Sequence, residues 1–354
     1  MKTLYEIVEM QGYCLVAEIG VNYYDIARQR NISNMDAAKL MCREAKEAGA
    51  DAVKFQTYKA EKLASKYSPS YWDTNEESME SQYELFRKYD LFGKEEYREI
   101  AEYCRMIDII FMSTPFDFEA VDYLDSMMDY YKISSSDITN LPFIRYISGK
   151  GKPVLLSTGA STEKEIEDAV KEIRKSGNSL ILMHCVLEYP TPDGHANLGK
   201  IRDLKEKYPD IIIGYSDHTK PEIGYDIIKT SYILGAKIIE KHFTLDKTLK
   251  GNDHYHAMDV ADIRNIKEHL EYLKLIIGNG GLSYLESEET ARMNARRSIV
   301  LSNDLNAGDI IKKENIIFKR PGTGIVPDAY EEVIGKRVLH DMKADTVLQW
   351  SDLM

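Results

Sequence analysis

Eight short apolar runs, each ending in polar or small residues, constrain the fold of this chain more than any other feature. They are Cys14–Gly20, Ala52–Thr57, Ile109–Pro115, Tyr130–Ser136, Pro153–Thr158, Leu180–Cys185, Ile211–Asp217 and Lys237–Phe243. The apolar residues in each run are continuous rather than alternating, which is typical of strands that are covered on both faces of a parallel sheet. We therefore expect eight buried parallel strands.

Segments with helical periodicity separate these runs. Residues 34–48, 162–175, 226–234 and 262–277 carry apolar side chains at helical spacing, and a glycine follows each segment within two residues. Strands that alternate with helices predict an α/β protein with a (β/α)₈ TIM barrel. A doubly wound open sheet is the competing architecture. Polar residues at the ends of nearly all the runs favour the barrel, because an open sheet concentrates them at one crevice.

The pattern changes near Gly281. We predict a TIM-barrel catalytic domain over residues 1–280, an acidic linker over 281–293 and a small β-rich domain over 294–354. The small domain contains four short β-type runs, which are Ser298–Ser302, Ile316–Lys319, Arg337–Leu339 and Val347–Trp350. Its core is modest, so we expect it to pack against the barrel or against another subunit.

Composition limits the partners and the location of the protein. The formal net charge of −12 argues against nucleic acid as a partner, because nucleic-acid binding needs a basic surface. The first residues lack the apolar region of a secretory signal, and no run approaches the length of a membrane span. The four cysteines are scattered and fit reduced thiols. We therefore expect a cytoplasmic protein with no membrane partner.

One connection between the predicted strands, from Tyr58 to Asp108, is unusually long and rich in aromatic residues. Long loops on barrel enzymes often form lids or interfaces. The alternative is an additional helix whose aromatic side chains pack on the side of the barrel. A second loop, Asp246–Asp259, follows the last strand and is polar, so it is a candidate either for shaping a substrate pocket or for a solvent-facing turn.

The ends of the predicted strands carry many of the side chains that catalysis uses. They are Glu18, Lys54, Gln56, Ser113, Thr114, Lys132, Ser134, Ser135, Ser157, His184, Ser216, Asp217, His218, Glu240, Lys241 and His242. A lysine near a buried strand end is costly unless an anion meets it. Lys54 and Lys132, with the nearby hydroxyl groups, therefore predict a cradle for a phosphate or carboxylate. The alternative is that each lysine pairs with a neighbouring carboxylate.

Two histidines follow adjacent strands at equivalent positions. His218 and His242 could converge on one divalent cation, because imidazole suits a borderline metal ion, and Glu240, Asp253 or a substrate would add oxygen ligands. A single histidine in such a place is more often a satisfied rim residue, but the pair favours a metal site. His184 precedes Cys185, and we interpret it mainly as a packing residue.

Together these stretches resemble the sialic acid synthase family, which makes nine-carbon nonulosonic acids from phosphoenolpyruvate and a mannosamine-type sugar. The matching segments are Ala17-Glu-Ile-Gly20, Lys54-Phe-Gln56, Ser113-Thr-Pro-Phe116, Lys132-Ile-Ser-Ser135, Ser157-Thr-Gly159, His184-Cys185, Tyr189-Pro190, Ser216-Asp-His218 and Glu240-Lys-His-Phe243. The tail segment Lys319-Arg-Pro-Gly322 resembles the motif of the antifreeze-like (SAF) domain that closes these enzymes. The resemblance covers almost the whole chain.

The resemblance implies a role for each matching position. It implies that His218 and His242 bind a divalent cation, Mn²⁺ or Mg²⁺. The positions implied to hold phosphoenolpyruvate are Lys54, Thr114, Lys132, Ser135, Ser157 and Ser216. The positions implied to hold the open-chain sugar are Glu18, Gln56, Tyr189 and Asp253, with Glu18 also the candidate for proton transfer. Arg320 is implied to reach the acylamino group of the sugar in the partner's site of a domain-swapped homodimer.

The resemblance further implies condensation of phosphoenolpyruvate with N-acetylmannosamine to give N-acetylneuraminate and phosphate. Two departures from the family pattern bear on this expectation. The first motif of the family continues Asn-His-x-Gly, whereas this chain has Asn22-Tyr-Tyr-Asp25, so the role of that histidine does not carry over. Leu187 stands where sialate-forming members commonly have asparagine. A 2,4-diacetamido-2,4,6-trideoxyhexose, used to make N,N'-diacetyllegionaminate or pseudaminate, is therefore the alternative acceptor.

Two other classes of function compete with a synthase. A lyase could use Lys132 as a Schiff base, and borohydride trapping of a substrate–lysine adduct would favour it. A carbohydrate-binding protein could use the tail domain and keep an inert barrel. The presence of Glu18, Lys54, Lys132 and both histidines in one chain disfavours an inert barrel.

Overall fold

The computed structural model describes the whole chain except residues 1, 73, 75–76, 223 and 252. The described chain divides into two compact units, residues 1–278 and 279–354. The first unit contains a parallel sheet whose strands are β1 (Cys14–Gly20), β2 (Ala52–Thr57), β3 (Ile110–Pro115), β4 (Tyr131–Ile133), β5 (Val154–Ser157), β6 (Leu180–His184), β7 (Ile212–Asp217) and β8 (Ile238–His242). The strand order is β3-β2-β1-β8-β7-β6-β5-β4, and β3 also contacts β4, so the sheet is a nearly closed barrel. The predicted TIM barrel is confirmed.

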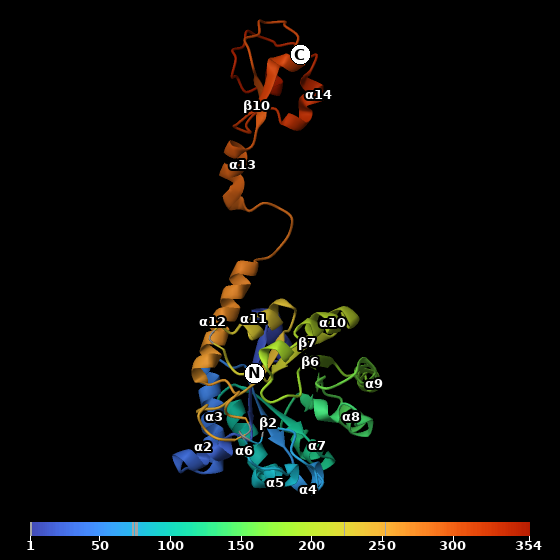
Figure 1. Cartoon of the computed structure of the whole chain (residues 1–354). Coiled ribbons are helices and arrows are strands. Elements are labelled where there is room, and N and C mark those ends of the chain that lie inside the picture. The colour runs from blue at the N-terminus through green and yellow to red at the C-terminus, as the bar shows by residue number, and fades with distance from the viewer. Residues whose placement is uncertain (1, 73, 75–76, 223, 252) are drawn as a thin grey trace. The chain divides into compact units, whose positions relative to one another are not determined.

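Helices surround the sheet (Figure 1). Those of the first unit are α1 (Leu4–Gln11), α2 (Tyr23–Arg30), α3 (Asn34–Ala48), α4 (Ala60–Leu63), α5 (Gln82–Lys88), α6 (Lys94–Met106), α7 (Phe118–Leu124), α8 (Leu141–Ser148), α9 (Glu163–Arg174), α10 (Gly199–Lys207), α11 (Asp226–Ile233) and α12 (Val260–Ile277). The bounds of α3 agree with the sequence prediction because both ends carry strong signals. Ser33 caps the first turn, and Gly49 adopts a φ of 110° at the end.

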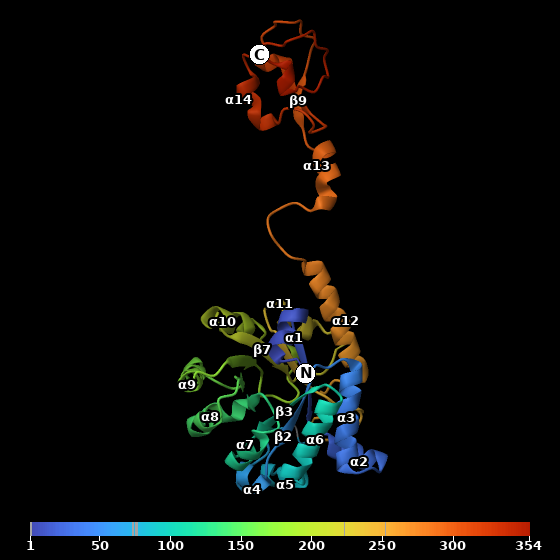
Figure 2. The same ribbon diagram turned by 180° about the vertical axis from the view of Figure 1, so that it is seen from behind.

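Side-chain alternation along each strand separates two layers of the core. Leu15, Ala17 and Ile19 of β1 belong to the large apolar cluster between sheet and helices. Cys14 and Val16 belong to a second apolar cluster, which also contains inward-facing residues of other strands and Leu4 of α1. Helix α1 therefore closes the N-terminal end of the barrel (Figure 2). Toward the C-terminal ends of the strands, polar residues instead of apolar ones occupy the inward-facing positions.

Close packing inside the barrel explains one glycine. A Cβ at Gly214 of β7 would lie 2.2 Å from Met183 Sδ and 2.7 Å from the Ile238 carbonyl oxygen. Both distances are shorter than any van der Waals contact, so a larger residue would push neighbouring strands apart. Gly214 is thus required by packing rather than by its backbone conformation.

The long connection 58–108 packs largely against the barrel. Trp72, Tyr89 and Phe92 are buried in the large apolar cluster between sheet and helices. The Phe92 ring stacks on that of Tyr23, with centroids 4.8 Å apart. Tyr71, in contrast, is exposed, and its ring lies 6.5 Å from that of Tyr189 at the C-terminal end of the barrel. The interpretation that the aromatic side chains of this segment pack on the barrel therefore holds for Trp72, Tyr89 and Phe92, and a role as a lid or interface stays a prediction.

The second unit contains α13 (Glu289–Ala295), β9 (Ser298–Leu301), β10 (Ile316–Lys319) and α14 (Tyr330–Val333). Strands β9 and β10 pair antiparallel, whereas the predicted runs at 337–339 and 347–350 take part only in single bridges. The predicted linker 281–293 contains the beginning of α13. Within the described residues, no helix combines the length and apolar character that a membrane span requires.

Candidate active site

The predicted strand-end residues gather in one pocket at the C-terminal end of the barrel. We call this the strand-end pocket; its lining is Glu18, Lys54, Gln56, Thr114, Phe116, Lys132, Ser134, Ser135, Ser157, Cys185, Tyr189, Ser216, His218, Glu240 and His242. Every residue to which the resemblance gives a role is included, except Asp253 and Arg320. Asp253 lies next to the pocket, with its Oδ2 atom 3.8 Å from His242 Nδ1. Arg320 belongs to the second unit.

The register between neighbouring strands places the charged side chains of the pocket at the same height along the barrel. Glu18 is the ladder partner of both Lys54 and His242, while Ser216 is that of Glu240. Residues that pair across parallel strands point to the same face of the sheet. The four strands β2, β1, β8 and β7 therefore present these groups side by side inside the barrel.

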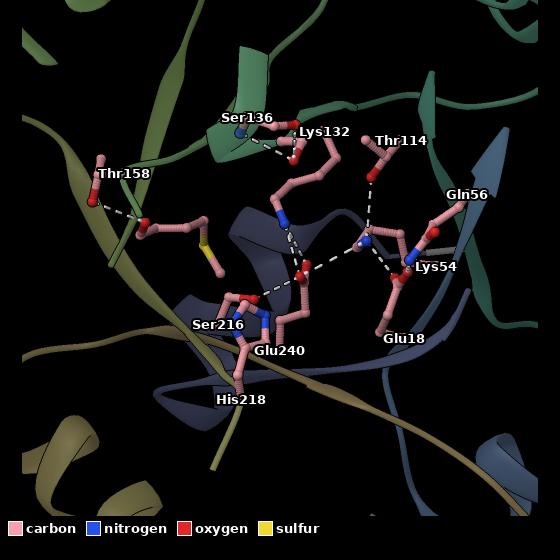
Figure 3. A network of polar contacts seen from close by, with 12 residues as sticks. Glu18, Lys54, Gln56, Thr114, Lys132, Ser136, Thr158, Ser216, His218 and Glu240 are labelled. Atoms are coloured by element: carbon pink, nitrogen blue, oxygen red, sulfur yellow. Dashed lines mark hydrogen bonds and ion pairs between the residues drawn. The ribbon is translucent and has the colours of Figure 1, made fainter. Parts of the chain in front are cut away.

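Both pocket lysines form buried ion pairs (Figure 3). Lys132 Nζ donates to both carboxylate oxygens of Glu240, at 2.7 and 2.9 Å. Lys54 contacts Glu18, lies 3.8 Å from Glu240 and donates to Thr114 Oγ1 at 3.2 Å. The alternative that each lysine pairs with a carboxylate is thus what the structure shows. An anion cradle remains a prediction, in which an anion displaces these carboxylates.

The pKa values of the two carboxyl groups in the pocket, Glu18 and Glu240, shift in opposite directions. Burial on its own raises the pKa of Glu240, but Lys132 and Lys54 lower it to about 2. Burial raises the pKa of Glu18, and Lys54 offsets only part of this effect. Burial also lowers the pKa of Lys132. Glu240 is therefore a permanent anion at neutral pH, whereas Glu18 is the better candidate for proton transfer.

Three buried histidines lie at the rim formed by β7 and β8. The ring centroids of His218 and His242 are 5.7 Å apart, and those of His242 and His256 are 4.9 Å apart. His218 Nδ1 donates to the Val186 carbonyl oxygen at 2.6 Å, which leaves Nε2 as its ligand atom. Burial lowers the pKa of His218 to about 4 and holds the pKa values of His242 and His256 well below their usual range. All three imidazoles are thus neutral, which is the form that binds metals.

The donors at this rim fit a divalent cation. Ligand atoms of His242, Asp253 and His256 lie within 4.8 Å of one another. Among the described residues, His242 Nδ1 and both ring nitrogens of His256 have no hydrogen-bond partner. Buried polar atoms without partners are costly and often mark a missing ion. Of the oxygen donors expected here, Glu240 is bound by Lys132 and Ser216, whereas Asp253 lies beside the histidines.

A set of contacts holds the described residues of the loop 246–259 over this rim. His254 lies between Thr244 Oγ1, at 2.8 Å, and Asp25 Oδ2, at 3.3 Å. Asn22 Nδ2 donates to the Phe243 carbonyl oxygen at 3.0 Å. The departure Asn22-Tyr-Tyr-Asp25 therefore has a structural consequence. It supplies the carboxylate that fixes His254 and, with it, the neighbouring Asp253.

Some strand-end residues face away from the pocket. Ser113 Oγ lies 2.6 Å from Thr57 Oγ1, and His184 Nε2 lies 2.9 Å from the Ala196 carbonyl oxygen. Asp217 accepts from Lys241 Nζ at 2.6 Å in a fully buried pair. Side chains of successive strand residues point to opposite faces, so each of these neighbours an inward-facing residue. Sequence reasoning missed His256, for which the only signal was its place in a polar loop.

Comparison with known proteins identifies the family of this chain. The NeuB family model matches residues 41–281, and the SAF domain model matches residues 296–354. The N,N'-diacetyllegionaminic acid synthase of Legionella pneumophila is 35% identical over 96% of this chain and 94% of its own length. The human N-acetylneuraminate-9-phosphate synthase is 27% identical over 94% of this chain and 90% of its own length.

A solved structure agrees with these matches. The N-acetylneuraminic acid synthetase of Leptospira borgpetersenii, determined with citrate, is 33% identical and has a TM-score of 0.67. The alignment covers 79% of this chain and 90% of that one. The resemblance inferred from the sequence is thereby confirmed. With its barrel, its pocket and its SAF domain, this chain belongs to the NeuB family of sialic acid synthases and is a phosphoenolpyruvate-condensing enzyme.

Proposed function

We propose that this enzyme joins phosphoenolpyruvate to an open-chain N-acylated mannosamine-type sugar and releases phosphate. The observation that carries the proposal is the strand-end pocket, in which two buried lysines face a rim of neutral histidines. Lysines bind phosphate and carboxylate as point charges, and phosphoenolpyruvate carries both groups. The sugar then binds on the histidine side, next to Asp253.

Entry of phosphoenolpyruvate requires the lysines to exchange partners. The strand-end pocket has a cavity volume of only 60 Å³, which holds a few water molecules. The lysine side chains therefore swing from Glu18 and Glu240 to the substrate. Hydroxyl groups of Thr114, Ser135 and Ser157 complete the cradle. Exchanging a carboxylate partner for a substrate anion keeps each ammonium paired. The carboxylates that lose their lysines keep one other donor each, Gln56 for Glu18 and Ser216 for Glu240.

The condensation forms one carbon–carbon bond and one carbon–oxygen bond to water, and it breaks the carbon–oxygen bond to phosphate. The methylene carbon of phosphoenolpyruvate attacks the aldehyde carbon of the sugar, water adds to the enol carbon, and the adduct expels phosphate. A divalent cation held by His218 and His242 would supply Lewis-acid polarisation of the aldehyde. Once Lys54 has moved to the substrate, burial favours the protonated form of Glu18, which Gln56 Nε2 still holds at 3.2 Å, and Glu18 is placed to give this proton to the new hydroxyl group. Orientation of two substrates supplies much of the rate.

The acceptor sugar meets a cavity beside the strand-end pocket, and one part of the wall of this cavity is apolar. This outer cavity has a volume of 400 Å³ and shares Gln56, Phe116, Ser134 and Tyr189 with the pocket. Its apolar part is formed by Leu63, Phe86 and Leu187, and its polar part by Gln82, Ser136 and Asp137. An apolar wall accommodates a methyl group and penalises a buried hydroxyl. This favours the 2,4-diacetamido-2,4,6-trideoxyhexose over N-acetylmannosamine, in agreement with the similarity to a diacetyllegionaminic acid synthase.

Phosphate release with a panel of N-acylated sugars tests the function and ranks the acceptors. The trideoxyhexose is expected to exceed N-acetylmannosamine in kcat/KM by about tenfold or more, because a hydroxyl placed against the apolar wall costs roughly 1–3 kcal/mol. In Leu187→Asn, the preference should fall while N-acetylmannosamine turnover rises. An absence of phosphate release with every sugar would refute the function. A preference for N-acetylmannosamine that survives Leu187→Asn would refute the role of the wall.

We further propose that the enzyme is a domain-swapped homodimer in which Arg320 contributes to the partner's site. If the SAF domain of one subunit completes the partner's site, Arg320→Ala and His242→Ala are each inactive but complement each other. Random mixing makes half of the dimers mixed, each with one complete site, so about a quarter of the parent activity returns. Native mass spectrometry verifies that subunits exchange. Exchange without recovery would show that Arg320 acts within its own chain, and full activity of Arg320→Ala alone would show that Arg320 has no role.

A further inference from the structure

The third histidine of the rim has a role that the pair of strand-end histidines does not explain. His256 lies in the loop 246–259, is fully buried, and its Nε2 is 3.9 Å from Asp253 Oδ1. The other carboxylate oxygen of Asp253 is 3.8 Å from His242 Nδ1. Two ligands that each lie about 2.1 Å from a cation are roughly 3–4 Å apart, so these separations match a shared ion after small adjustments.

Packing alone does not explain why a histidine occupies this buried position. Within the described part of the chain, neither of its ring nitrogens has a hydrogen-bond partner, and neither does His242 Nδ1. An apolar residue would fill the same space better, because a buried polar atom without a partner costs about 1–3 kcal/mol. His254, two positions earlier, shows the contrast: both of its nitrogens are engaged, by Thr244 and Asp25.

The loop that carries these donors is held in place. Met258 N donates to the His242 carbonyl oxygen at 2.7 Å, and Thr244 N donates to the Met258 carbonyl oxygen at 2.9 Å. The Tyr255 hydroxyl donates to the Tyr189 carbonyl oxygen at 3.1 Å. These contacts bracket His256 on both sides and bring it back over the end of β8. Fixed ligands lose little entropy when they bind a metal.

We propose that His242, Asp253 and His256 form a three-ligand site that holds a divalent cation before either substrate binds. The inference deepens the metal requirement of the proposed function and rests on that function. His218 then approaches the same ion from the side of Tyr189, on whose ring it packs with centroids 4.1 Å apart. Two imidazoles and a carboxylate leave positions open for substrate oxygens. Imidazole ligands favour transition-metal ions such as Fe²⁺, Co²⁺ or Zn²⁺ over Mg²⁺, which prefers oxygen, and the carboxylate also suits Mn²⁺.

The test is metal binding by the full-length protein, measured with Mn²⁺ alone. After removal of metals with EDTA, Mn²⁺ is titrated in the absence of substrates and free Mn²⁺ is followed by electron paramagnetic resonance. The parent protein should bind one Mn²⁺ per chain, and excess Mg²⁺ should compete poorly. His256→Ala and the larger His256→Gln should each weaken binding at least about tenfold. His256→Asp, which restores a ligand atom, should regain part of the affinity.

A control variant and three measurements separate ligand loss from structural damage. The control His269→Ala changes a half-buried histidine on α12 and should bind Mn²⁺ like the parent. Circular dichroism and melting temperature verify the fold of each variant. Pulsed electron paramagnetic resonance of bound Mn²⁺ counts coordinated nitrogens, and one should disappear in His256→Gln.

The inference and the proposed function fail in different ways. If His256→Ala and His256→Gln bind Mn²⁺ within about threefold of the parent, or if the parent binds none without substrate, the three-ligand site is wrong. Phosphate release by the parent with metal, phosphoenolpyruvate and a sugar would still uphold the function. Conversely, His256-dependent Mn²⁺ binding without any phosphate release would uphold the site and overturn the function.

Discussion

His242→Ala is expected to lower kcat/KM by about 1,000-fold or more while phosphoenolpyruvate binding persists within a few-fold. His242 is the histidine shared by both proposed ligand arrangements, since its ring lies 5.7 Å from that of His218 and 4.9 Å from that of His256. Loss of this ligand removes the polarisation of the aldehyde, whereas the lysine cradle for phosphoenolpyruvate stays intact. Phosphate release gives the rate, and calorimetry gives the affinity for phosphoenolpyruvate.

The control for this experiment is His269→Ala on α12, which is expected to keep the parent rate. Treatment of the parent with a chelator should reproduce the loss seen in His242→Ala, and added Mn²⁺ should reverse it. Full turnover after chelation, or in His242→Ala, would contradict a metal role for this rim. Equal loss of phosphoenolpyruvate affinity and turnover would instead indicate that the substitution damages the whole pocket.

The second large effect is expected for Lys132→Met. Lys132 and Glu240 are both deeply buried, with 3% and 4% of their surface exposed. Removal of the lysine leaves the Glu240 carboxylate with Ser216 at 2.9 Å and with Lys54 at 3.8 Å. A buried charge that loses its main partner costs about 3–5 kcal/mol of unfolding free energy. Urea denaturation should show this loss, and phosphate release should be abolished because the anion cradle is broken.

A matched double variant separates stability from catalysis. In Lys132→Met/Glu240→Gln, the unpaired charge is gone, so most of the unfolding free energy should return while activity does not. Removing both members of a buried ion pair is often close to neutral, in contrast to removing one. A Lys132→Met protein as stable as the parent would show that Lys54 alone satisfies Glu240. Activity in either variant would exclude Lys132 from phosphoenolpyruvate binding.

The sequence predicted those parts of the fold that depend on local patterns. Continuous apolar runs identified the strands, and the bounds of β1, β2 and α3 agree with the structure. Other strands were predicted too long, as at 130–136, where β4 covers only Tyr131–Ile133. The ladder ends there because Ser134 and its neighbours turn into a 3₁₀ helix, in which Ser134 Oγ accepts from Ser136 N. Such a capping contact is not visible in an apolar run.

The same local patterns identified which residues stand at the strand ends. Motif order and spacing were enough to place Glu18, Lys54, Lys132, His218 and His242 in one pocket. A barrel with all strands parallel necessarily brings their C-terminal ends to one rim, so this part of the site follows from the fold class alone.

Only the tertiary structure decided which strand-end residues face each other. The register between β7 and β8 sets Ser216 beside Glu240, and the Glu240 carboxylate accepts hydrogen bonds from Ser216 and Lys132. The folded-back loop brings the ring of His256 to within 4.9 Å of that of His242, although fourteen positions separate them in the chain. The sequence specifies the residue types and the alternation of faces. Distances between strands and loops arise only when barrel closure and loop packing fix the register, because no local pattern encodes that geometry.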